Sequence, residues 1–196
     1  NLTFSKIRVD AEAETRKRMG IKCPSYQDVT IDEIYDCMSD LYGIDKSITD
    51  KLKEKEKELE ISLCMQRKAT KELYDVAMVA GKKVIFTSDM YLDRKTIEAI
   101  LEKNDYKGYE RLFLSSDERL TKSSGELFRA VLRELNTKGS NVIHIGDTWQ
   151  NDINNAKSCG ITPIFLPKTI EVFENKIADI STNNCATIAN KVMSSM

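Results

Sequence analysis

The sequence predicts an α/β fold, a Rossmann-like parallel sheet with helices on both faces, preceded by an N-terminal helical module. Two observations lead to this prediction. The first 80 residues show helical periodicity without a convincing strand, whereas short apolar segments alternate with amphipathic ones after Gly81. Such alternation is typical of a parallel sheet covered on both faces. A chain of 196 residues can bury one core and still carry a small accessory module.

The helical module, residues 1–80, begins with a helix predicted by apolar residues at helical spacing. These residues are Phe4, Ile7 and Ala11. The glycine and proline within residues 20–24 are expected to break this helical pattern, because neither residue is favoured in a helix interior.

The second helix has the clearest signal in the chain. Thr30 and Glu33 form the pattern of a capping box, in which the threonine hydroxyl accepts from a first-turn N–H and the glutamate reaches back. Gly43 is a natural terminator. The apolar face between these signals consists of Ile31, Ile34, Tyr35, Met38, Leu41 and Tyr42.

Two further helices complete the module. Residues 49–68 are rich in lysine and glutamate, and we interpret them as a solvated helix with intrahelical ion pairs rather than as a binding tract. Its sparse apolar contacts are Leu52, Leu59 and Leu63. The apolar side of the last helix, predicted over residues 71–80, consists of Leu73, Val76, Ala77 and Ala80.

The second part of the chain has four predicted strands. They span residues 84–88, 111–115, 141–146 and 162–166. Helices are expected over residues 95–103, 125–136, 151–159 and 170–178, followed by a polar tail. The predicted organisation is therefore a helical module over 1–80, a core over 81–168, and a C-terminal helix and tail over 169–196.

Composition narrows the class of protein. Charged residues make up 31% of the chain and the formal net charge is -1, so no single-sign field indicates nucleic acid or an anionic membrane as a partner. No apolar run approaches the roughly 20 residues of a membrane span, and we expect a cytoplasmic protein. The 5 cysteines lack any Cys-x-x-Cys spacing, which favours reduced thiols over disulfides or a zinc site.

Polar residues follow the predicted strands, at the carboxyl ends where ligands bind in an open parallel sheet. They are Thr87, Ser88 and Asp89 after the first strand, Ser115 to Asp117 leading to Lys122 after the second, Asp147 and Asp152 after the third, and Lys168 after the fourth. Hydroxyl, ammonium and paired carboxylate groups together predict a site for a phosphate group and a divalent cation.

The first two of these segments resemble active-site motifs of the haloacid dehalogenase (HAD)-like hydrolase superfamily. The apolar strand that ends in Thr87, Ser88 and Asp89 resembles the second motif. The resemblance implies that the Ser88 hydroxyl, with Thr87 as the alternate, binds the transferring phosphoryl oxygen. Residues 121–128 resemble the third motif, which implies that Lys122 neutralises the phosphate and steadies the nucleophilic carboxylate.

Residues 144–153 resemble the fourth motif of the same superfamily, where acidic residues hold magnesium directly or through water. The resemblance therefore implies Mg²⁺ as cofactor, with Asp147 and Asp152 as candidate ligands. His144 is the single histidine, so no metal or triad role is expected for it. Trp149 could line the pocket or pack against the end of the sheet.

A narrower resemblance concerns residues 88–92, Ser-Asp-Met-Tyr-Leu, which look like a subgroup found beside or fused to bacterial surface-polysaccharide glycosyltransferases. Residues 4–16 and 30–35 resemble the helical cap of that subgroup. A glycosyltransferase domain or partner is therefore implied. The resemblance covers residues 4–166, and its specificity lies in the order and spacing of the three motifs, since each motif alone could be an ordinary turn, cap or surface residue.

The first motif of the superfamily, an apolar strand ending in Asp-x-Asp that supplies the nucleophile and the general acid, has no counterpart in the sequence. We therefore expect these 196 residues to bind phosphate and magnesium without forming an aspartyl-phosphate, and so to be inactive. In the superfamily that strand lies between those predicted at 84–88 and 141–146. Upstream residues, or residues 2–9 recruited as a strand, are expected to fill this place.

The intact protein is thus expected to be a Mg²⁺-dependent phosphatase or phosphohydrolase acting on a small phosphorylated metabolite. The alternative is a non-catalytic domain of the same fold that binds phosphate or docks a glycosyltransferase. A third interpretation, an unrelated parallel α/β binding domain, treats the motif match as coincidence.

Overall fold

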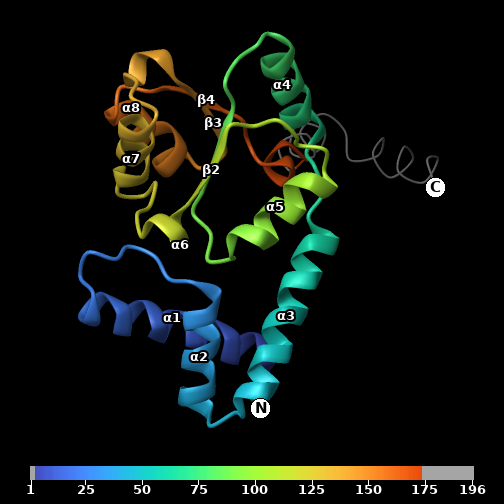
Figure 1. Cartoon of the computed structure of the whole chain (residues 1–196), viewed down its shortest axis with the longest axis vertical. Coiled ribbons are helices and arrows are strands. Elements are labelled where there is room, and N and C mark those ends of the chain that lie inside the picture. Colours follow the sequence, from blue (N-terminus) through green and yellow to red (C-terminus); the bar gives the residue numbers. More distant parts are fainter. Residues whose placement is uncertain (1–2, 174–196) are drawn as a thin grey trace, which may run out of the picture. The chain divides into compact units, whose positions relative to one another are not determined.

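The computed structural model describes residues 3–173, whose elements are labelled in Figure 1, and these residues divide into two compact units between Leu135 and Asn136. The first unit contains the helical module together with β1 and β2, and the second contains β3 and β4. The predicted boundary at residue 80 therefore lies inside the first unit. Parallel strands flanked by helices confirm the predicted fold class.

The first helix, α1, spans Phe4–Lys22, and the Thr3 hydroxyl accepts from the Lys6 N–H at its start. The predicted break within residues 20–24 is confirmed, although Gly20 itself keeps a helical backbone. The helix ends just before the Cys23–Pro24 step, where proline disfavours helical geometry in the preceding residue. Since residues 4–9 are helical, their recruitment as a strand is also excluded.

The second helix, α2, spans Ile31–Tyr42 and confirms the predicted capping box. The Thr30 hydroxyl accepts from the Glu33 N–H at 3.2 Å, and the Glu33 carboxylate accepts from the Thr30 N–H at 2.8 Å. Gly43 ends the helix in a left-handed conformation with φ 63°. The predicted apolar face is buried except at its end, where Leu41 is exposed and Tyr42 is half-buried.

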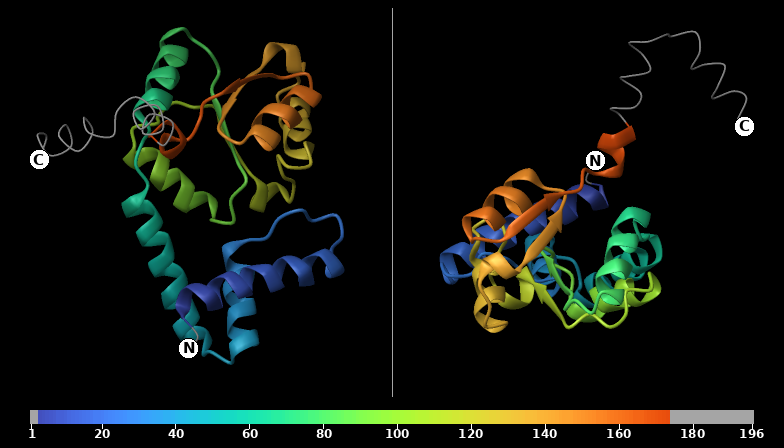
Figure 2. Two further views of the ribbon diagram at one scale, coloured as in Figure 1. Left: turned by 180° about the vertical axis from the view of Figure 1, so that it is seen from behind. Right: turned by 90° about the horizontal axis from the view of Figure 1, so that it is seen from above.

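The third helix, α3, spans Lys46–Leu63 and carries the predicted intrahelical ion pairs, including Lys55 with Glu58 and Lys57 with Glu54. Its predicted contacts Leu59 and Leu63 are exposed, whereas Leu52 packs against the helical core. Figures 1 and 2 show α3 running from the helical module to α5, which it contacts.

The fourth helix, α4, spans Lys68–Val79 and buries a different side from the one predicted. Leu73 and Val76 are exposed, whereas Tyr74 is buried and stacks on Phe86 with ring centroids 5.8 Å apart. A tyrosine buries more area than these aliphatic side chains and keeps its hydroxyl paired, here with the Lys107 carbonyl. The aromatic contact therefore sets the orientation of the helix.

Four strands form two parallel pairs. In the first unit, β1 (Ile85–Ser88) pairs with β2 (Arg111–Leu114), with α5 (Arg94–Lys103) between them in sequence. In the second unit, β3 (Ile143–Gly146) pairs with β4 (Thr162–Phe165). All four strands fall within the predicted ranges. Among the described residues β1 pairs only with β2, and β3 only with β4, so each pair is a separate sheet.

The remaining helices differ in regularity. After β2 comes a short helix that was not predicted, α6 (Ser115–Glu118), and then α7 (Glu126–Glu134) as predicted. In the second unit, η1 (Gly139–Asn141) precedes β3, while η2 (Trp149–Asn155) and α8 (Ala156–Ser158) follow it. The helix expected over 151–159 is present, but most of it is the π-helix η2, a wide turn that often occurs at functional sites.

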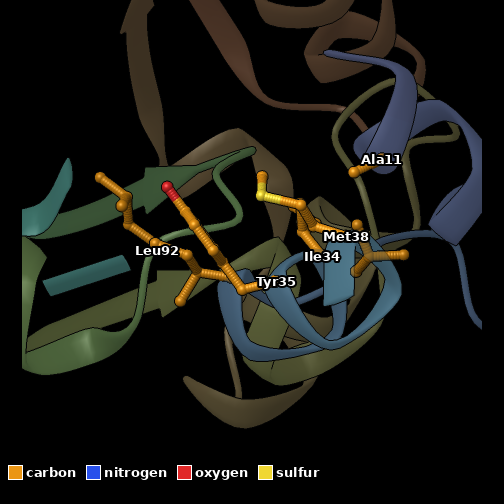
Figure 3. Close-up of a cluster of buried hydrophobic side chains, with 7 residues drawn as sticks. Ala11, Ile34, Tyr35, Met38 and Leu92 are labelled. Carbon is orange, nitrogen blue, oxygen red and sulfur yellow. The ribbon is translucent and has the colours of Figure 1, made fainter. Parts of the chain in front are cut away.

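The main apolar cluster of the first unit lies in the helical module. Its buried members include Ala11, Ile34, Tyr35 and Met38 from α1 and α2, together with Leu92 from the loop after β1 (Figure 3). A second cluster, formed by Phe113, Leu127 and Val131, packs α7 on β2. Leu92 thereby anchors the loop after β1 in the helical module.

Some predictions lie at the limits of the described residues. The helix predicted over 170–178 lies mostly outside them, and the polar tail and Cys185 lie wholly outside. Within 3–173 the four cysteines are free thiols, as expected. Over the same range, no helix has the length and apolar character required to cross a bilayer.

Candidate functional site

The end of β1 and the loop before α7 meet in the first unit. Ser88 is the last residue of β1, and Asp89 follows it directly. Both oxygens of the Asp89 carboxylate accept from the Lys122 backbone N–H, at 2.9 and 3.1 Å. The structure thus brings together segments 33 residues apart that carry Thr87, Ser88, Asp89 and Lys122.

The environment of Asp89 changes its acidity. Burial raises the pKa of Asp89, the N–H and positive charge of Lys122 oppose that rise, and the nearby Asp28 carboxylate adds to it. Because its oxygens already hold the backbone of the Lys122 loop, Asp89 is placed to shape the site. A direct contact between Asp89 and a substrate stays a prediction.

Lys122 lies in a tight turn that leads into α7. The Gly125 N–H donates to the Lys122 carbonyl at 3.0 Å, and Gly125 itself is left-handed with φ 79°. The Thr121 and Ser123 hydroxyls are 2.8 Å apart. The half-buried Lys122 side chain therefore begins from a constrained backbone at a helix N-terminus, where positive potential favours an anion.

An ion pair joins α2 to the segment between α6 and Lys122. Arg119 donates to both oxygens of Glu33, at 2.7 and 2.9 Å, and to the Asp28 carbonyl at 3.0 Å. Burial alone would raise the pKa of Glu33, but the hydrogen bonds from Arg119 and Thr30 and the Arg119 charge lower it. Glu33, a member of the capping box, therefore also links the helical module to the segment that leads to Lys122.

The two predicted metal ligands lie in the second unit. Asp152 is buried, and its carboxylate pairs with the His144 ring Nε2 at 3.0 Å and accepts from the Thr148 N–H at 3.0 Å. Asp147 is half-buried and accepts from the Thr148 hydroxyl at 3.3 Å. The Asp152 side chain thus fixes the turn that presents Asp147.

Gly146 makes this arrangement possible. A Cβ at Gly146 would lie 2.4 Å from both Cβ and Cγ of Asp152, closer than any ordinary contact. The Asp152 side chain therefore packs directly on the Gly146 backbone, which explains why a glycine precedes Asp147. In the same segment, Trp149 packs edge-to-face on Phe165, with centroids 5.0 Å apart, so of its two expected roles the contact at the strand end is present.

The carboxylates of Asp147 and Asp152 supply part of what a magnesium site requires. Mg²⁺ takes oxygen ligands and commonly keeps several waters beside one or two carboxylates. Asp147 suits a direct ligand, whereas Asp152, held by two donors, suits an orienting role. Within residues 3–173 no cluster of three or more acidic, histidine or cysteine groups could hold a metal, so Asp147 and Asp152 alone do not make a complete set of protein ligands.

Several residues of these sites carried no signal in the sequence. Gln27 reaches the Lys122 loop, and Asp28 reaches Ser115 and Arg119, across 87 to 94 residues of sequence, and their spacing matches no motif. His144 was expected to have no metal or triad role, and the structure pairs it with Asp152 instead. The one available signal was that His144 lies on the same strand as Gly146, on which the Asp152 side chain packs.

Comparison with known proteins identifies the fold. No protein-family profile matches the chain, and no curated protein sequence matches it significantly. The 2-haloacid dehalogenase from Pseudomonas syringae pv. tomato DC3000 is similar in structure, with a TM-score of 0.56 and 16% identity, covering 80% of this chain and 68% of that one.

Two further solved structures agree. A haloacid dehalogenase-like family hydrolase from Xanthomonas campestris gives a TM-score of 0.55 at 14% identity over 84% of this chain and 76% of its own. A HAD family enzyme from Bacteroides thetaiotaomicron, in complex with magnesium and inorganic phosphate, gives 0.53 at 14% identity, covering 84% of this chain and 87% of its own. The chain therefore has the HAD-like α/β fold.

Proposed function

We propose that this chain is the larger part of a HAD-type, Mg²⁺-dependent phosphohydrolase that acts on a small phosphorylated metabolite. The observation that carries the proposal is the contact between the Asp89 carboxylate and the Lys122 backbone. It joins the two loops whose sequences resemble phosphate-binding motifs. The magnesium and inorganic phosphate bound to the structurally similar Bacteroides enzyme support the same ligand class.

Each residue has a defined role in this proposal. The Ser88 hydroxyl, with Thr87 as the alternate, donates to a phosphoryl oxygen, and the Lys122 ammonium neutralises the phosphate charge. Asp147 holds Mg²⁺ directly, while Asp152 orients the turn that carries Asp147. The bound ion would neutralise negative charge on the phosphate.

The attacking carboxylate is the missing component. The 196 residues contain no Asp-x-Asp string, and neither Asp89 nor Asp93 has the required spacing. We propose that these residues by themselves bind phosphate and magnesium without turnover, and that the nucleophile belongs to a segment outside them. An upstream strand of this kind requires on the order of 20 to 40 residues together with its loop and part of a helix.

A non-catalytic domain that binds phosphate or docks a glycosyltransferase is the second candidate. The absence of Asp-x-Asp from the sequence favours it. The resemblance of residues 88–92 to glycosyltransferase-associated proteins supplies the partner class. Gene sequence upstream of the Asn1 codon separates the candidates: an apolar strand ending in Asp-x-Asp favours the enzyme, and a strand without these carboxylates favours the binding domain.

Ligand binding tests the site in the chain as it exists. Trp149 is the single tryptophan and lies two residues after Asp147, so its fluorescence should report magnesium. We expect Asp147→Asn to weaken magnesium binding about tenfold or more, whereas Asp105→Asn, which removes the same charge from an exposed loop, should not. Magnesium binding that survives both Asp147→Asn and Asp152→Asn would show the metal assignment to be wrong.

Phosphate binding tests the residues of the first unit, by calorimetry with inorganic phosphate. Lys122→Met should weaken binding about tenfold or more, and Lys83→Met, which removes an exposed lysine just before β1, should leave binding unchanged. Equal binding by both variants would contradict the proposal. If an upstream nucleophile is found, release of phosphate or of halide from a 2-haloacid by the extended protein distinguishes a phosphohydrolase from a dehalogenase.

A further inference from the structure

The loop between α1 and α2 carries a buried carboxylate that the proposed chemistry does not use. Asp28 is 4% exposed, and its Oδ1 accepts from Arg16 at 2.6 Å and from the Val29 N–H at 2.8 Å. Its Oδ2 accepts from the hydroxyl of Ser115, the residue directly after β2. A buried carboxylate is costly unless it is paired in this way, so the position of Asp28 is strongly determined.

Ser115 connects Asp28 to the loop after β1. The Met90 N–H donates to the Ser115 hydroxyl oxygen at 2.8 Å, so the hydroxyl proton is directed to Asp28. Two neighbouring contacts fix the same segment, because the Tyr91 carbonyl accepts from the Ile31 N–H at 2.8 Å and Leu92 is buried in the helical cluster. The helical module therefore holds Tyr91 and Leu92 directly and Met90 through Ser115.

Gln27, the neighbour of Asp28, holds the second loop. Its side-chain Oε1 accepts from the Thr121 N–H at 3.0 Å and from the Ser124 hydroxyl at 2.6 Å, and its own N–H donates to the Arg119 carbonyl at 3.0 Å. Thr121 and Ser124 flank Lys122 in sequence. Two adjacent residues of the helical module thus reach both loops that Asp89 joins.

We infer that Gln27 and Asp28 are positioning residues that set the backbone of the loop directly after Ser88 and of the loop carrying Lys122, and thereby the spacing of the two phosphate-binding groups. This inference rests on the proposed function, in which both loops bind phosphate. Asp28 acts through Ser115 and Met90, and Gln27 acts directly on the Thr121 N–H. The α1–α2 loop then shapes the site without contacting the ligand.

The test compares two adjacent serines in the full chain, with inorganic phosphate as the probe. Ser115→Ala breaks the link between Asp28 and Met90. Ser116→Ala is the matched control, because Ser116 is also buried but donates to the Leu92 carbonyl instead. We expect Ser115→Ala alone to speed amide hydrogen exchange at Met90 and to raise the Kd for phosphate, each about tenfold. Gln27→Met, which replaces a surface side chain, should speed exchange at Thr121 about two- to threefold.

The outcomes separate this inference from the proposed function. Unchanged exchange at Met90 in Ser115→Ala, or an equal rise in Kd in Ser116→Ala, would overturn the positioning role. If the wild-type chain binds no phosphate, the proposed function fails together with the role in phosphate binding. In that case the exchange rates at Met90 and Thr121 still decide whether Gln27 and Asp28 fix the two loops.

Discussion

Asp89 accepts the backbone N–H of Lys122 with both carboxylate oxygens, at 2.9 and 3.1 Å. The side chain of one predicted phosphate-binding segment therefore holds the main chain of the other. Because a buried N–H left without a partner is costly, we expect Asp89→Ala to lower the free energy of unfolding by about 1–3 kcal/mol. Urea denaturation measures the change. The same replacement at Asp40, which is 75% exposed, should change it by less than about 0.5 kcal/mol.

The ion pair between Glu33 and Arg119 predicts a pH dependence. Since the pKa of Glu33 is lowered in the folded state, its stabilisation is fully present above the ordinary glutamate pKa and is lost as the pH falls through the lowered value. We expect Arg119→Met to lower the free energy of unfolding by about 1 kcal/mol at pH 7, after allowance for solvent screening of a partly exposed pair.

That difference between wild type and Arg119→Met should shrink below about pH 4, as Glu33 becomes protonated in both proteins. Urea denaturation of both proteins at a series of pH values from about 3 to about 7, a range that includes the usual glutamate pKa, measures the trend. A difference that stays constant over this interval would show that Arg119 stabilises the fold by packing alone.

Arg8 forms the most buried ion pair of the helical module. Its guanidinium donates to both oxygens of Glu56, at 2.8 and 3.0 Å, and the Tyr35 hydroxyl donates to the same carboxylate at 2.5 Å. Arg8→Met leaves the Glu56 carboxylate partly buried without its cation, so we expect a loss of about 3–5 kcal/mol in the free energy of unfolding. Thermal denaturation measures it.

The matched control for Arg8 is Lys55→Met, which removes a cation from an exposed pair on α3. Its effect should stay below about 1 kcal/mol. Equal effects of the two replacements would mean that burial of the Arg8–Glu56 pair contributes nothing beyond an ordinary surface pair.

Gly146 and Gly20 predict opposite effects of the same replacement. A Cβ at Gly146 collides with the Asp152 side chain, so Gly146→Ala should destabilise the second unit by about 1–3 kcal/mol and weaken magnesium binding. A Cβ at Gly20 would meet no atom within 4 Å, and Gly20 lies in α1, so Gly20→Ala should stabilise the first unit by about 0.5–1 kcal/mol. Destabilisation by both replacements, measured by thermal denaturation, would contradict the steric account.

Much of the local structure was predictable because its signals are local. Thr30 and Glu33 are three residues apart, and their capping box depends only on that spacing and a helical backbone. The four strands were predicted because short apolar runs bounded by turn residues need no distant partner to be recognised. The orientation of α4 was not predictable in this way, because Tyr74 buries itself against Phe86 and Tyr106 from later in the chain.

The α/β class, the helical module, the strand positions and the order of Ser88, Lys122 and Asp147 can all be read from the sequence, since they follow from periodicity and short motifs. The partners that hold these residues depend on the tertiary structure. Gln27 meets Thr121 across 94 residues, and Asp28 meets Ser115 across 87. Hydrogen bonds over such separations depend on how helices and strands pack, and packing is not encoded in the spacing of neighbouring residues.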